Sequence, residues 1–463
     1  MFDSKIYADR RARLKEQIGS GLLLFLGNEE SPMNYPANPY HFRQDSTFLY
    51  FFGLDTPSLA AIVDVDQGKD MIFGNDVDME DIIWMGQLPT IKERASLVGV
   101  TETAPLVQFE ETVKAAQQKG QTIHYLPPYR PENVTRIAQL LGIEHDSVNK
   151  YTSKEFIKAV VAQRNVKIPE EIGQMELAHE VTYDMYIAAM KMAKSGVYEY
   201  EIVGKMDGII SASDCHVAFP IILTKNGQIL HNHYHGNKLE QGNLLVMDAG
   251  SDSPMNYASD ITRTVPVGGK FTQKQKQIYE IVLQAQETAI QNIKPGIMFK
   301  DIHLQSASVI ASGLKDVGLM KGDMDAAVQA GAHALFFPHG LGHMIGLDVH
   351  DMEDLGEDFV GYDHTVERST QFGLAYLRLA KKLEPGYVLT VEPGIYFIPA
   401  LIDKWASENK FDQFIDYAKV EEYRDFSGIR IEDDILVTQD GNKVLGKSIP
   451  KTVEGVEEIT ATD

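Results

Sequence analysis

In the amino-terminal third of the chain, short apolar runs alternate with stretches whose apolar residues recur every three or four positions. The runs lie at residues 22–26, 48–52, 60–65, 71–73 and 123–126. Apolar runs of this length favour buried strands, and residues 132–141 have the spacing typical of an amphipathic helix. This alternation predicts an α/β domain.

A change of pattern marks the end of this domain. Residues 153–163 have helical spacing, and Pro169 with Glu170 and Glu171 then forms a typical helix start. Proline is preorganised for the first helical turn, and acidic side chains stabilise the positive end of the helix dipole. We place the boundary near residues 151–167, which gives predicted domains at 1–155 and 165–463.

The second domain combines helical spacing with strand-like runs. Apolar positions at near-helical spacing are Met175, Thr182, Met185, Ala189 and Met192, and a second helical stretch covers residues 273–293. Strand-like runs lie at 244–247, 388–391 and 429–437. No repeat or low-complexity tract interrupts these segments. The combination of helical and strand-like segments predicts helices packed on a sheet.

The composition narrows the class of protein. The chain has 463 residues, of which 44% are hydrophobic and 24% charged, and this fits a globular protein with more than one core. Its formal net charge of −23 opposes binding to nucleic acid and to anionic membranes. No apolar run is long enough for a membrane span or a signal peptide core. These features predict a soluble, cytoplasmic protein.

Cys215 is the only cysteine, so no intramolecular disulfide can form. A lone cysteine is more often a small buried hydrophobe than a nucleophile, and it agrees with a reducing compartment. It also excludes a metal site built on several thiolates.

Ionisable residues interrupt apolar, glycine-bearing segments of the second domain. Asp248 and Asp260 lie in MDAGSD and ASDITRT, His343 in HGLGHMIGLDVHD, Glu392 in TVEPGIY and Glu432 in GIRIEDD. Each alone is most often a solvated strand end or an acid that caps a turn. Burying four carboxylates together would cost several kcal/mol per charge or force them to take up protons. The five residues together therefore indicate a metal site.

The donor types narrow the chemistry of this site. Four carboxylates and one imidazole suit two hard or borderline cations joined by shared carboxylates, which favours Mn²⁺ with Co²⁺, Zn²⁺ or Fe²⁺ as substitutes. Two such ions hold a bridging water as hydroxide near neutral pH and stabilise the oxyanion that forms when it attacks a carbonyl. The pattern predicts a hydrolase.

The order Asp-x(11)-Asp, then His, Glu and Glu, resembles the pita-bread metallopeptidases. These include aminopeptidase P and prolidase, with methionine aminopeptidase and creatinase as more distant relatives; creatinase lacks the metal ligands that are present here. The segments FRQDS (42–46) and WMG (84–86) also resemble the amino-terminal domain of aminopeptidase P and prolidase. The resemblance covers nearly the whole chain and implies an α/β amino-terminal domain followed by an α+β pita-bread catalytic domain.

The resemblance implies a role for each of the five residues. Asp248 would chelate one metal ion, whereas Asp260 and Glu432 would bridge both. His343 and Glu392 would complete the second ion's site. Glu392 would also pass a proton to the leaving nitrogen, because it lies beside the bridging hydroxide.

Three further residues match positions around the metal ions. The resemblance implies that His231 and His350 contact the substrate near the scissile bond and that Arg430 orients the acids. His339 fits a glycine-flanked wall of the site. For the histidine tract at 231–235, a polar loop without function is the alternative.

The two acids that follow Glu432 are not assigned to the site. Adjacent residues on a strand point to opposite faces, so Asp433 is expected to point away from the metal ions if Glu432 points toward them. Asp434 is left without a role.

The resemblance implies an Xaa-Pro aminopeptidase, which removes the first residue of peptides with proline in second position. Proline has no peptide N–H and a fixed ring, so it defeats ordinary peptidases and calls for a dedicated site. Prolidase, an Xaa-Pro dipeptidase, is the first alternative, because the insertion at residues 398–423 resembles prolidase. The alternative of another class is a non-catalytic binding protein on the same fold, which would be expected to have lost at least one ligand.

The resemblance also implies a homo-oligomer, either a dimer or a tetramer. In relatives the amino-terminal domain mediates assembly, and a tryptophan matching Trp84 can reach a neighbour's active site. The alternative for Trp84 is an ordinary core residue. The sequence leaves open the peptide length, the physiological metal, the preferred first residue and the number of subunits.

Overall fold

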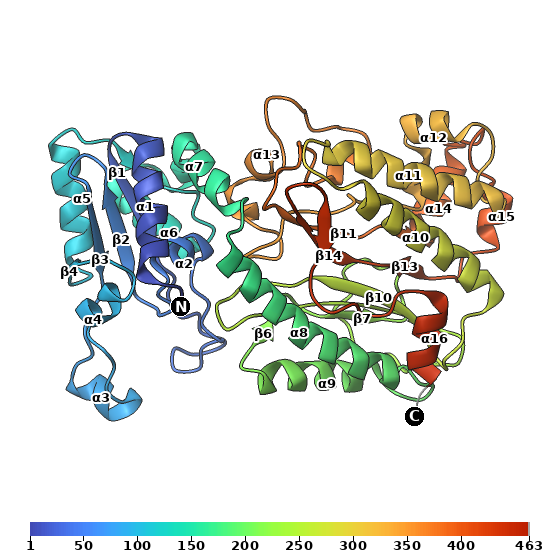
Figure 1. Ribbon diagram of the computed structural model, residues 1–463, viewed down its shortest axis with the longest axis horizontal. Coiled ribbons are helices and arrows are strands. Elements are labelled where there is room, and N and C mark those ends of the chain that lie inside the picture. Colours follow the sequence, from blue (N-terminus) through green and yellow to red (C-terminus); the bar gives the residue numbers. More distant parts are fainter. Residues whose placement is uncertain (462–463) are drawn as a thin grey trace. The chain divides into compact units, whose positions relative to one another are not determined.

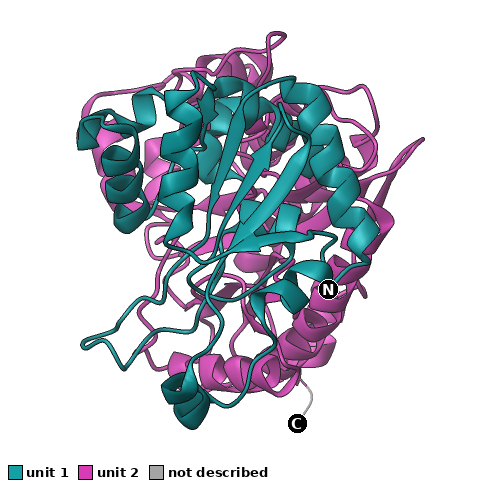
Figure 2. Cartoon of the chain, turned by 90° about the vertical axis from the view of Figure 1, so that its left-hand side faces the viewer, with its two compact units in different colours: residues 1–164, 352–359 teal, residues 165–351, 360–463 magenta. Residues whose placement is uncertain are grey.

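The chain forms two compact units, which Figure 2 shows in two colours. The computed structural model describes residues 1–461. The first unit comprises Met1–Arg164 with the short segment Met352–Phe359, and the second comprises Asn165–Asp351 with the chain from Val360 onward. The linear sequence pattern did not indicate that Met352–Phe359 groups with the first unit.

The first unit is built on a five-stranded sheet of order β4-β3-β2-β1-β5. Its strands are β1 (Leu22–Leu26), β2 (Ala60–Asp64), β3 (Lys69–Phe73), β4 (Glu102–Ala104) and β5 (Ile123–His124). Its helices include α1 (Ser4–Ile18), α3 (Met79–Met85), α4 (Ile91–Ser96), α5 (Gln108–Gln118), α6 (Pro131–Leu141) and α7 (Lys154–Arg164). The three central strands pair antiparallel, and β4 and β5 add parallel at the edges. Strands and helices share one apolar core, which confirms the α/β prediction.

Residues 48–52 form a helix, not the strand that the apolar run predicted. Helix α2 (Ser46–Phe52) begins after Asp45, whose side chain accepts the N–H of Phe48, and ends at Gly53 in a left-handed conformation. All of its residues are buried. Because a fully buried helix has no polar face, its pattern cannot be told from that of a buried strand.

The second unit surrounds several small sheets with long helices. The sheet orders are β10-β8-β7, β11-β14-β15, β12-β13 and β6-β9. The strands are β6 (His216–Val217), β7 (Ile222–Thr224), β8 (Leu244–Ala249), β9 (Ser251–Asp252), β10 (Ile261–Pro266), β11 (Val388–Val391), β12 (Gly394–Tyr396), β13 (Gly428–Arg430), β14 (Asp433–Val437) and β15 (Asn442–Val444). The longer helices are α8 (Pro169–Met192), α9 (Glu199–Ala212), α10 (Gln273–Asn292), α11 (Phe299–Asp316) and α16 (Val453–Ala461). In Figure 1 the strands lie between α8 and α9 on one side and α10 and α11 on the other, as the pattern of helices on a sheet predicted.

The apolar run at 429–437 is two strands, not the single run that the sequence indicated. Strand β13 ends at Arg430, β14 begins at Asp433, and the two belong to different sheets. Between them, the Glu432 N–H donates to the Thr262 carbonyl oxygen at 3.0 Å. The sequence pattern does not show where β13 ends and β14 begins, because both strands are buried.

Strand register brings distant acids together. Thr262 of β10 pairs with Asp248 of β8 on one side and with Glu432 on the other. Asp260 precedes Thr262 by two residues, so in extended chain its side chain points to the same face.

Among the described helices, none has both the length and the apolar character that crossing a lipid bilayer requires.

Candidate metal centre

Three buried side chains from distant segments converge in the second unit. Asp260, His343 and Glu432 each offer one ligand atom, and these atoms all lie within 4.8 Å of one another. His343 Nε2 lies 3.5 Å from Asp260 Oδ2 and 3.7 Å from Glu392 Oε1. Four of the five ligands predicted from the sequence therefore lie in one cluster.

The Arg430 guanidinium links the fifth acid, Asp248, to this cluster. Nη2 donates to Asp248 Oδ2 at 2.5 Å, Nε to Thr262 Oγ1 at 3.2 Å and Nη1 to the Tyr396 hydroxyl at 2.8 Å. Thr262 Oγ1 in turn donates to Glu432 Oε2 at 2.7 Å. This geometry suits the orienting role expected of Arg430.

A backbone contact orients the His343 ring. Its Nδ1 lies 3.1 Å from the Met344 carbonyl oxygen. Because a carbonyl oxygen only accepts, Nδ1 carries the ring proton and Nε2 presents its lone pair to Asp260 and Glu392. Burial lowers the pKa of His343 well below its usual value, which keeps the ring neutral. Neutral imidazole held in this way is the form that binds metal.

The acids are too crowded to ionise together without cations. Burial and then Glu432 raise the pKa of Asp260 well above its usual value, and burial and then Glu392 do the same for Glu432. Burial raises the pKa of Glu392 to about 8. Within residues 1–461, the buried Oδ1 atoms of Asp248 and Asp260 have no hydrogen-bond partner. Divalent metal ions would balance the crowded negative charges and would bind the buried oxygen atoms that have no partner, so the donor set fits them.

The predicted substrate-contacting histidines also belong to this region. The rings of His350 and His343 meet edge to face with centroids 4.4 Å apart. Burial lowers the pKa of His231, Arg430 lowers it further and Asp248 raises it, so His231 lies within electrostatic range of both. The structure thus brings all eight predicted site residues into one region of the second unit.

His339 contributes to the same site through Tyr396. Its Nδ1 lies 2.8 Å from the Gly340 carbonyl oxygen and its Nε2 lies 2.9 Å from the Tyr396 hydroxyl. Since Nδ1 carries the proton, Nε2 accepts the hydrogen bond of a hydroxyl that itself accepts from Arg430. His339 Nδ1 also lies 3.9 Å from Glu392 Oε2.

Comparison with known proteins decides the family. The model of metallopeptidase family M24 matches residues 173–439, and that of the aminopeptidase P amino-terminal domain matches residues 7–124. The chain belongs to metallopeptidase family M24. It therefore uses divalent metal ions, for which the cluster at Asp260, His343 and Glu432 is the candidate site.

Relatives of this M24 metallopeptidase span its whole length. Human Xaa-Pro dipeptidase is 30% identical, and the match covers 98% of this chain and 92% of the relative. A probable Xaa-Pro aminopeptidase of Sordaria macrospora is 31% identical over 99% of this chain and 96% of its own length.

Solved structures confirm the pita-bread fold. Proline aminopeptidase P II from Yersinia pestis aligns with a TM-score of 0.83 at 28% identity, covering 99% of this chain and 100% of that one. A variant of Escherichia coli aminopeptidase P in complex with substrate aligns with a TM-score of 0.81 at 28% identity, covering 99% and 98%.

Two residues of the M24 metallopeptidase site were not predicted from the sequence. Thr262 and Tyr396 connect Arg430 to Glu432 and to His339. Thr262 lies two residues after Asp260, and that spacing is a usable signal for a shared strand face. Tyr396 gave no such signal, because its contacts depend on how β12 meets segments from elsewhere in the sequence.

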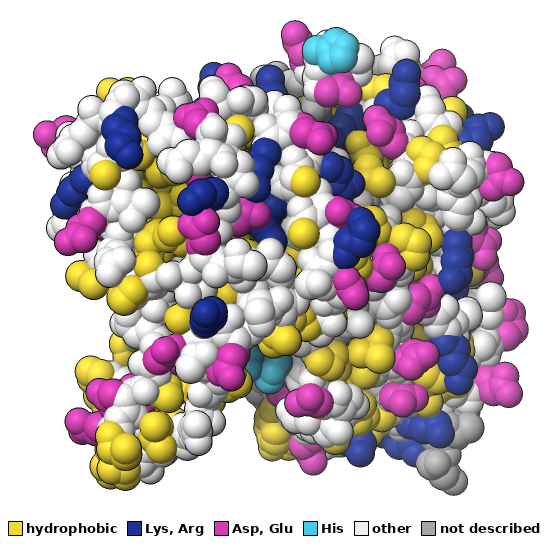
Figure 3. Space-filling model, turned by 60° about the vertical axis from the view of Figure 1, so that its left-hand side comes forward, with side chains coloured by type: hydrophobic (Ala, Val, Ile, Leu, Met, Phe, Trp, Pro, Cys, Tyr) yellow, Lys and Arg dark blue, Asp and Glu magenta, His cyan; other side chains and the backbone are white. Residues whose placement is uncertain are grey.

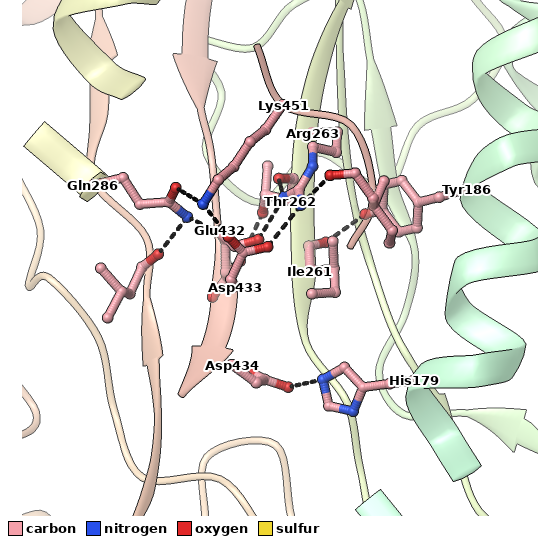
Figure 4. A network of polar contacts seen from close by, with 12 residues as sticks. His179, Tyr186, Ile261, Thr262, Arg263, Gln286, Glu432, Asp433, Asp434 and Lys451 are labelled. Carbon is pink, nitrogen blue, oxygen red and sulfur yellow. Dashed lines mark hydrogen bonds and ion pairs between the residues drawn. The ribbon is translucent and has the colours of Figure 1, made fainter. Parts of the chain in front are cut away.

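Asp433 points away from the cluster, as strand alternation predicted. Its Oδ1 pairs with Arg263 Nη2 at 2.6 Å and its Oδ2 pairs with Lys451 Nζ at 2.6 Å (Figure 4). Arg263 also donates to the Glu432 carbonyl oxygen at 2.6 Å. This network holds the main chain of Glu432 from the side opposite to the metal centre.

Proposed function

We propose that this M24 metallopeptidase is an Xaa-Pro aminopeptidase, which removes the first residue of peptides that carry proline in second position. The observation that carries the proposal is the convergence of Asp260, His343 and Glu432 to within 4.8 Å, with Glu392 and Asp248 joined to them. Relatives named Xaa-Pro aminopeptidase and Xaa-Pro dipeptidase support the preference for proline. All five proposed ligands are present, which a non-catalytic binding protein would not need.

We assign two divalent metal ions to the centre, with Mn²⁺ preferred. Asp248 would hold one ion, Asp260 and Glu432 would be shared, and His343 and Glu392 would hold the other. A donor set of four carboxylates and one imidazole is mostly oxygen, which suits Mn²⁺. Co²⁺, Zn²⁺ and Fe²⁺ are possible substitutes, and one solved E. coli aminopeptidase P is zinc-substituted. When bound, such ions polarise the scissile carbonyl and lower the pKa of the attacking water.

Residues of the chain move the proton and hold the peptide. Glu392 takes up the proton that the attacking water releases and passes it to the proline nitrogen as the peptide bond breaks. That nitrogen must gain a proton, because it leaves as an amine when the peptide bond breaks. His231 and His350 contact the peptide beside the scissile bond, and Arg430 holds Asp248 by their hydrogen bond.

The second candidate is an Xaa-Pro dipeptidase. It is favoured by the human relative of that name and by the insertion at residues 398–423, which contains α14 (Pro399–Ser407) and α15 (Tyr417–Glu421). A lid over the exit of the site would admit only dipeptides, because a longer peptide must continue past the proline.

The contacts of this insertion favour the aminopeptidase. The Trp405 ring meets that of Phe372 edge to face with centroids 5.7 Å apart, and Ile415 forms a β-bridge with Met320. The first contact attaches the insertion to the loop before the 3₁₀ helix Leu374–Tyr376, the second attaches it to the residues that follow α11, and Trp405 is buried. Packing onto the unit thus accounts for the apolar residues of the insertion without a lid.

Product analysis distinguishes the two candidates. With Mn²⁺ present, we expect free glycine and Pro-Gly-Gly from Gly-Pro-Gly-Gly, whereas a dipeptidase would hydrolyse Gly-Pro and leave the tetrapeptide intact. Replacing residues 406–414 by a short glycine-serine linker should leave the ratio of the two rates unchanged. A shift of that ratio toward the tetrapeptide would identify the insertion as a lid.

We further propose a homo-oligomer, either a dimer or a tetramer. None of the residues of α3 is buried, and Met79, Ile83 and Trp84 are 71%, 72% and 80% exposed, so Trp84 is not a core residue. Figure 3 shows hydrophobic and acidic side chains side by side on the part of the surface that protrudes at the lower left of the view. Exposed apolar groups gathered on one element are typical of an interaction surface.

We infer a cytoplasmic location for the protein. Cys215 is buried and free, and a single unpaired thiol persists most readily in a reducing compartment. Fractionation of cells that produce the protein tests this, and recovery outside the cytoplasmic fraction would contradict it.

A further inference from the structure

One face of α8 carries three polar side chains that are almost fully buried. His179, Thr182 and Tyr186 are 3%, 0% and 0% exposed. Their spacings of three and four residues place them on the same side of the helix. We call these three residues the α8 polar stripe. Buried polar groups are costly unless they are hydrogen-bonded, so their partners indicate what they do.

The stripe contacts the residues on both sides of Asp260. Thr182 Oγ1 lies 2.8 Å from Ser259 Oγ, and the Tyr186 hydroxyl donates to the Ile261 carbonyl oxygen. A proposed metal ligand therefore lies between two neighbours that are both hydrogen-bonded to the same helix.

Tyr186 also contacts the residues on both sides of Asp248. Its hydroxyl accepts the Ala249 N–H at 3.1 Å and lies 3.0 Å from the Met247 carbonyl oxygen. The single hydroxyl proton is thus shared between the carbonyls of Met247 on β8 and Ile261 on β10. Figure 4 shows the contact with Ile261. One side chain therefore fixes the spacing between the main chains at two proposed ligands.

His179 reaches Asp260 through Asp434. His179 Nε2 lies 2.9 Å from Asp434 Oδ2 (Figure 4). The same Oδ2 accepts the backbone N–H of Asp260 at 2.9 Å. His179 Nδ1 lies 2.7 Å from the Met175 carbonyl oxygen and so carries a proton. Although burial lowers the pKa of His179, the contact with Asp434 raises it overall.

We propose that the α8 polar stripe positions the main chain at Asp248 and Asp260 and thereby sets the affinity of the centre for its divalent metal ions. The inference rests on the metal centre proposed above. The contacts of the stripe go to main-chain groups, to Ser259 and to Asp434, so its members are positioning residues. Substitution of residues that orient metal ligands without binding the metal weakens metal binding or activity by roughly 10–100-fold.

Titration of the metal-free protein with Mn²⁺ in a calorimeter tests the proposal. Tyr186→Phe removes only the hydroxyl and His179→Leu removes the partner of Asp434, so each should raise the Mn²⁺ Kd by roughly 10–100-fold. His179→Gln keeps an N–H donor near the position of Nε2 and should recover part of the affinity. Met185→Ala, on the same helix, is the control; it opens a cavity that lowers the Tm and should leave the Kd unchanged.

The outcomes separate the stripe from the metal centre itself. If the parent protein binds Mn²⁺ and Tyr186→Phe binds it equally well, the positioning role is wrong and the metal centre stands. If Met185→Ala weakens binding as much as Tyr186→Phe, loss of stability explains the effect and the positioning role is again wrong. If the parent protein binds no Mn²⁺, the proposed centre is wrong as well. Should His179→Leu fail to fold, Tyr186→Phe decides the question.

Discussion

At the residue scale, the central feature is a pair of carboxylates that we assign to both metal ions. Asp260→Asn and Glu432→Gln should each lower the bound metal from about two ions per chain toward none, because each removes a ligand of both ions. Elemental analysis after dialysis measures this loss. The exposed Asp316→Asn serves as the control and should keep both ions. Retention of one tightly bound ion by the Asp260 variant would contradict a shared ligand.

The Tyr396 hydroxyl provides a second test at this scale. Tyr396→Phe would leave Arg430 Nη1 and His339 Nε2 without this partner in a buried site, so kcat/KM should fall by about tenfold. Tyr125→Phe is the matched control, because the Tyr125 hydroxyl donates to the Val148 carbonyl oxygen in the first unit. It should lower the Tm without lowering kcat/KM. Equal kinetic losses in the two variants would show that the effect on Tyr396 is one of stability alone.

The sequence predicts residues of the site where a charge interrupts an apolar run. Asp260 and Glu432 stand out in this way, because a buried acid needs a physical reason. Thr262 is marked only by its spacing from Asp260, since threonine is common in strands, and Thr182 fits an apolar helical position. Their roles depend on which main chain lies opposite, and that is a property of the fold.

At the scale of elements, two buried histidines on α11 and on the 3₁₀ helix Ala332–Leu335 make the second unit sensitive to acid. Within the described residues, neither ring of His303 or His333 has a hydrogen-bond partner. Burial, and then His333, lower the pKa of His303 to about 3, and burial lowers that of His333 to about 4, from an ordinary value of 6.5. At pH values between the lowered pKa of each histidine and 6.5, the unfolded chain binds more protons than the folded one. Stability is therefore full above pH 6.5 and falls as the pH drops toward 4.

This pH dependence is measurable by thermal unfolding. We expect the Tm to fall between about pH 7 and pH 4.5, and to fall less steeply in the variant His303→Leu, which has one such group fewer. Comparing the slopes of Tm against pH separates the contribution of His303 from that of the carboxylates, because the parent protein and the variant have the same carboxylates. Identical slopes would mean that His303 does not titrate on unfolding in this range.

Most elements follow from local pattern, and the exceptions have a common cause. Strands such as β1 and β11 and helices such as α6 and α10 lie where periodicity predicted them. Helix α2 and the pair β13 and β14 do not, because their residues are buried on all sides and periodicity then carries no direction. The assignment of Met352–Phe359 to the first unit depends on contacts between residues distant in sequence, and no local pattern records these.

At the scale of the whole molecule, α3 makes assembly testable. The parent protein should sediment as a dimer or tetramer at micromolar concentration, and Ile83→Asp combined with Trp84→Asp should shift it toward the monomer, because charges would be buried in the interface. Tyr151→Asp changes another exposed aromatic residue of the first unit and should leave the assembly intact. A monomeric parent protein would contradict the proposal.

The most direct test of the whole account is release of the amino-terminal residue from paired peptides. The Mn²⁺-loaded protein is incubated with Gly-Pro-Gly-Gly and, separately, with Gly-Ala-Gly-Gly, and free glycine is measured with and without a chelator. The account predicts glycine and Pro-Gly-Gly from the proline peptide alone, with release reduced to background by the chelator. Equal cleavage of both peptides, or release that survives removal of the metal, would contradict it.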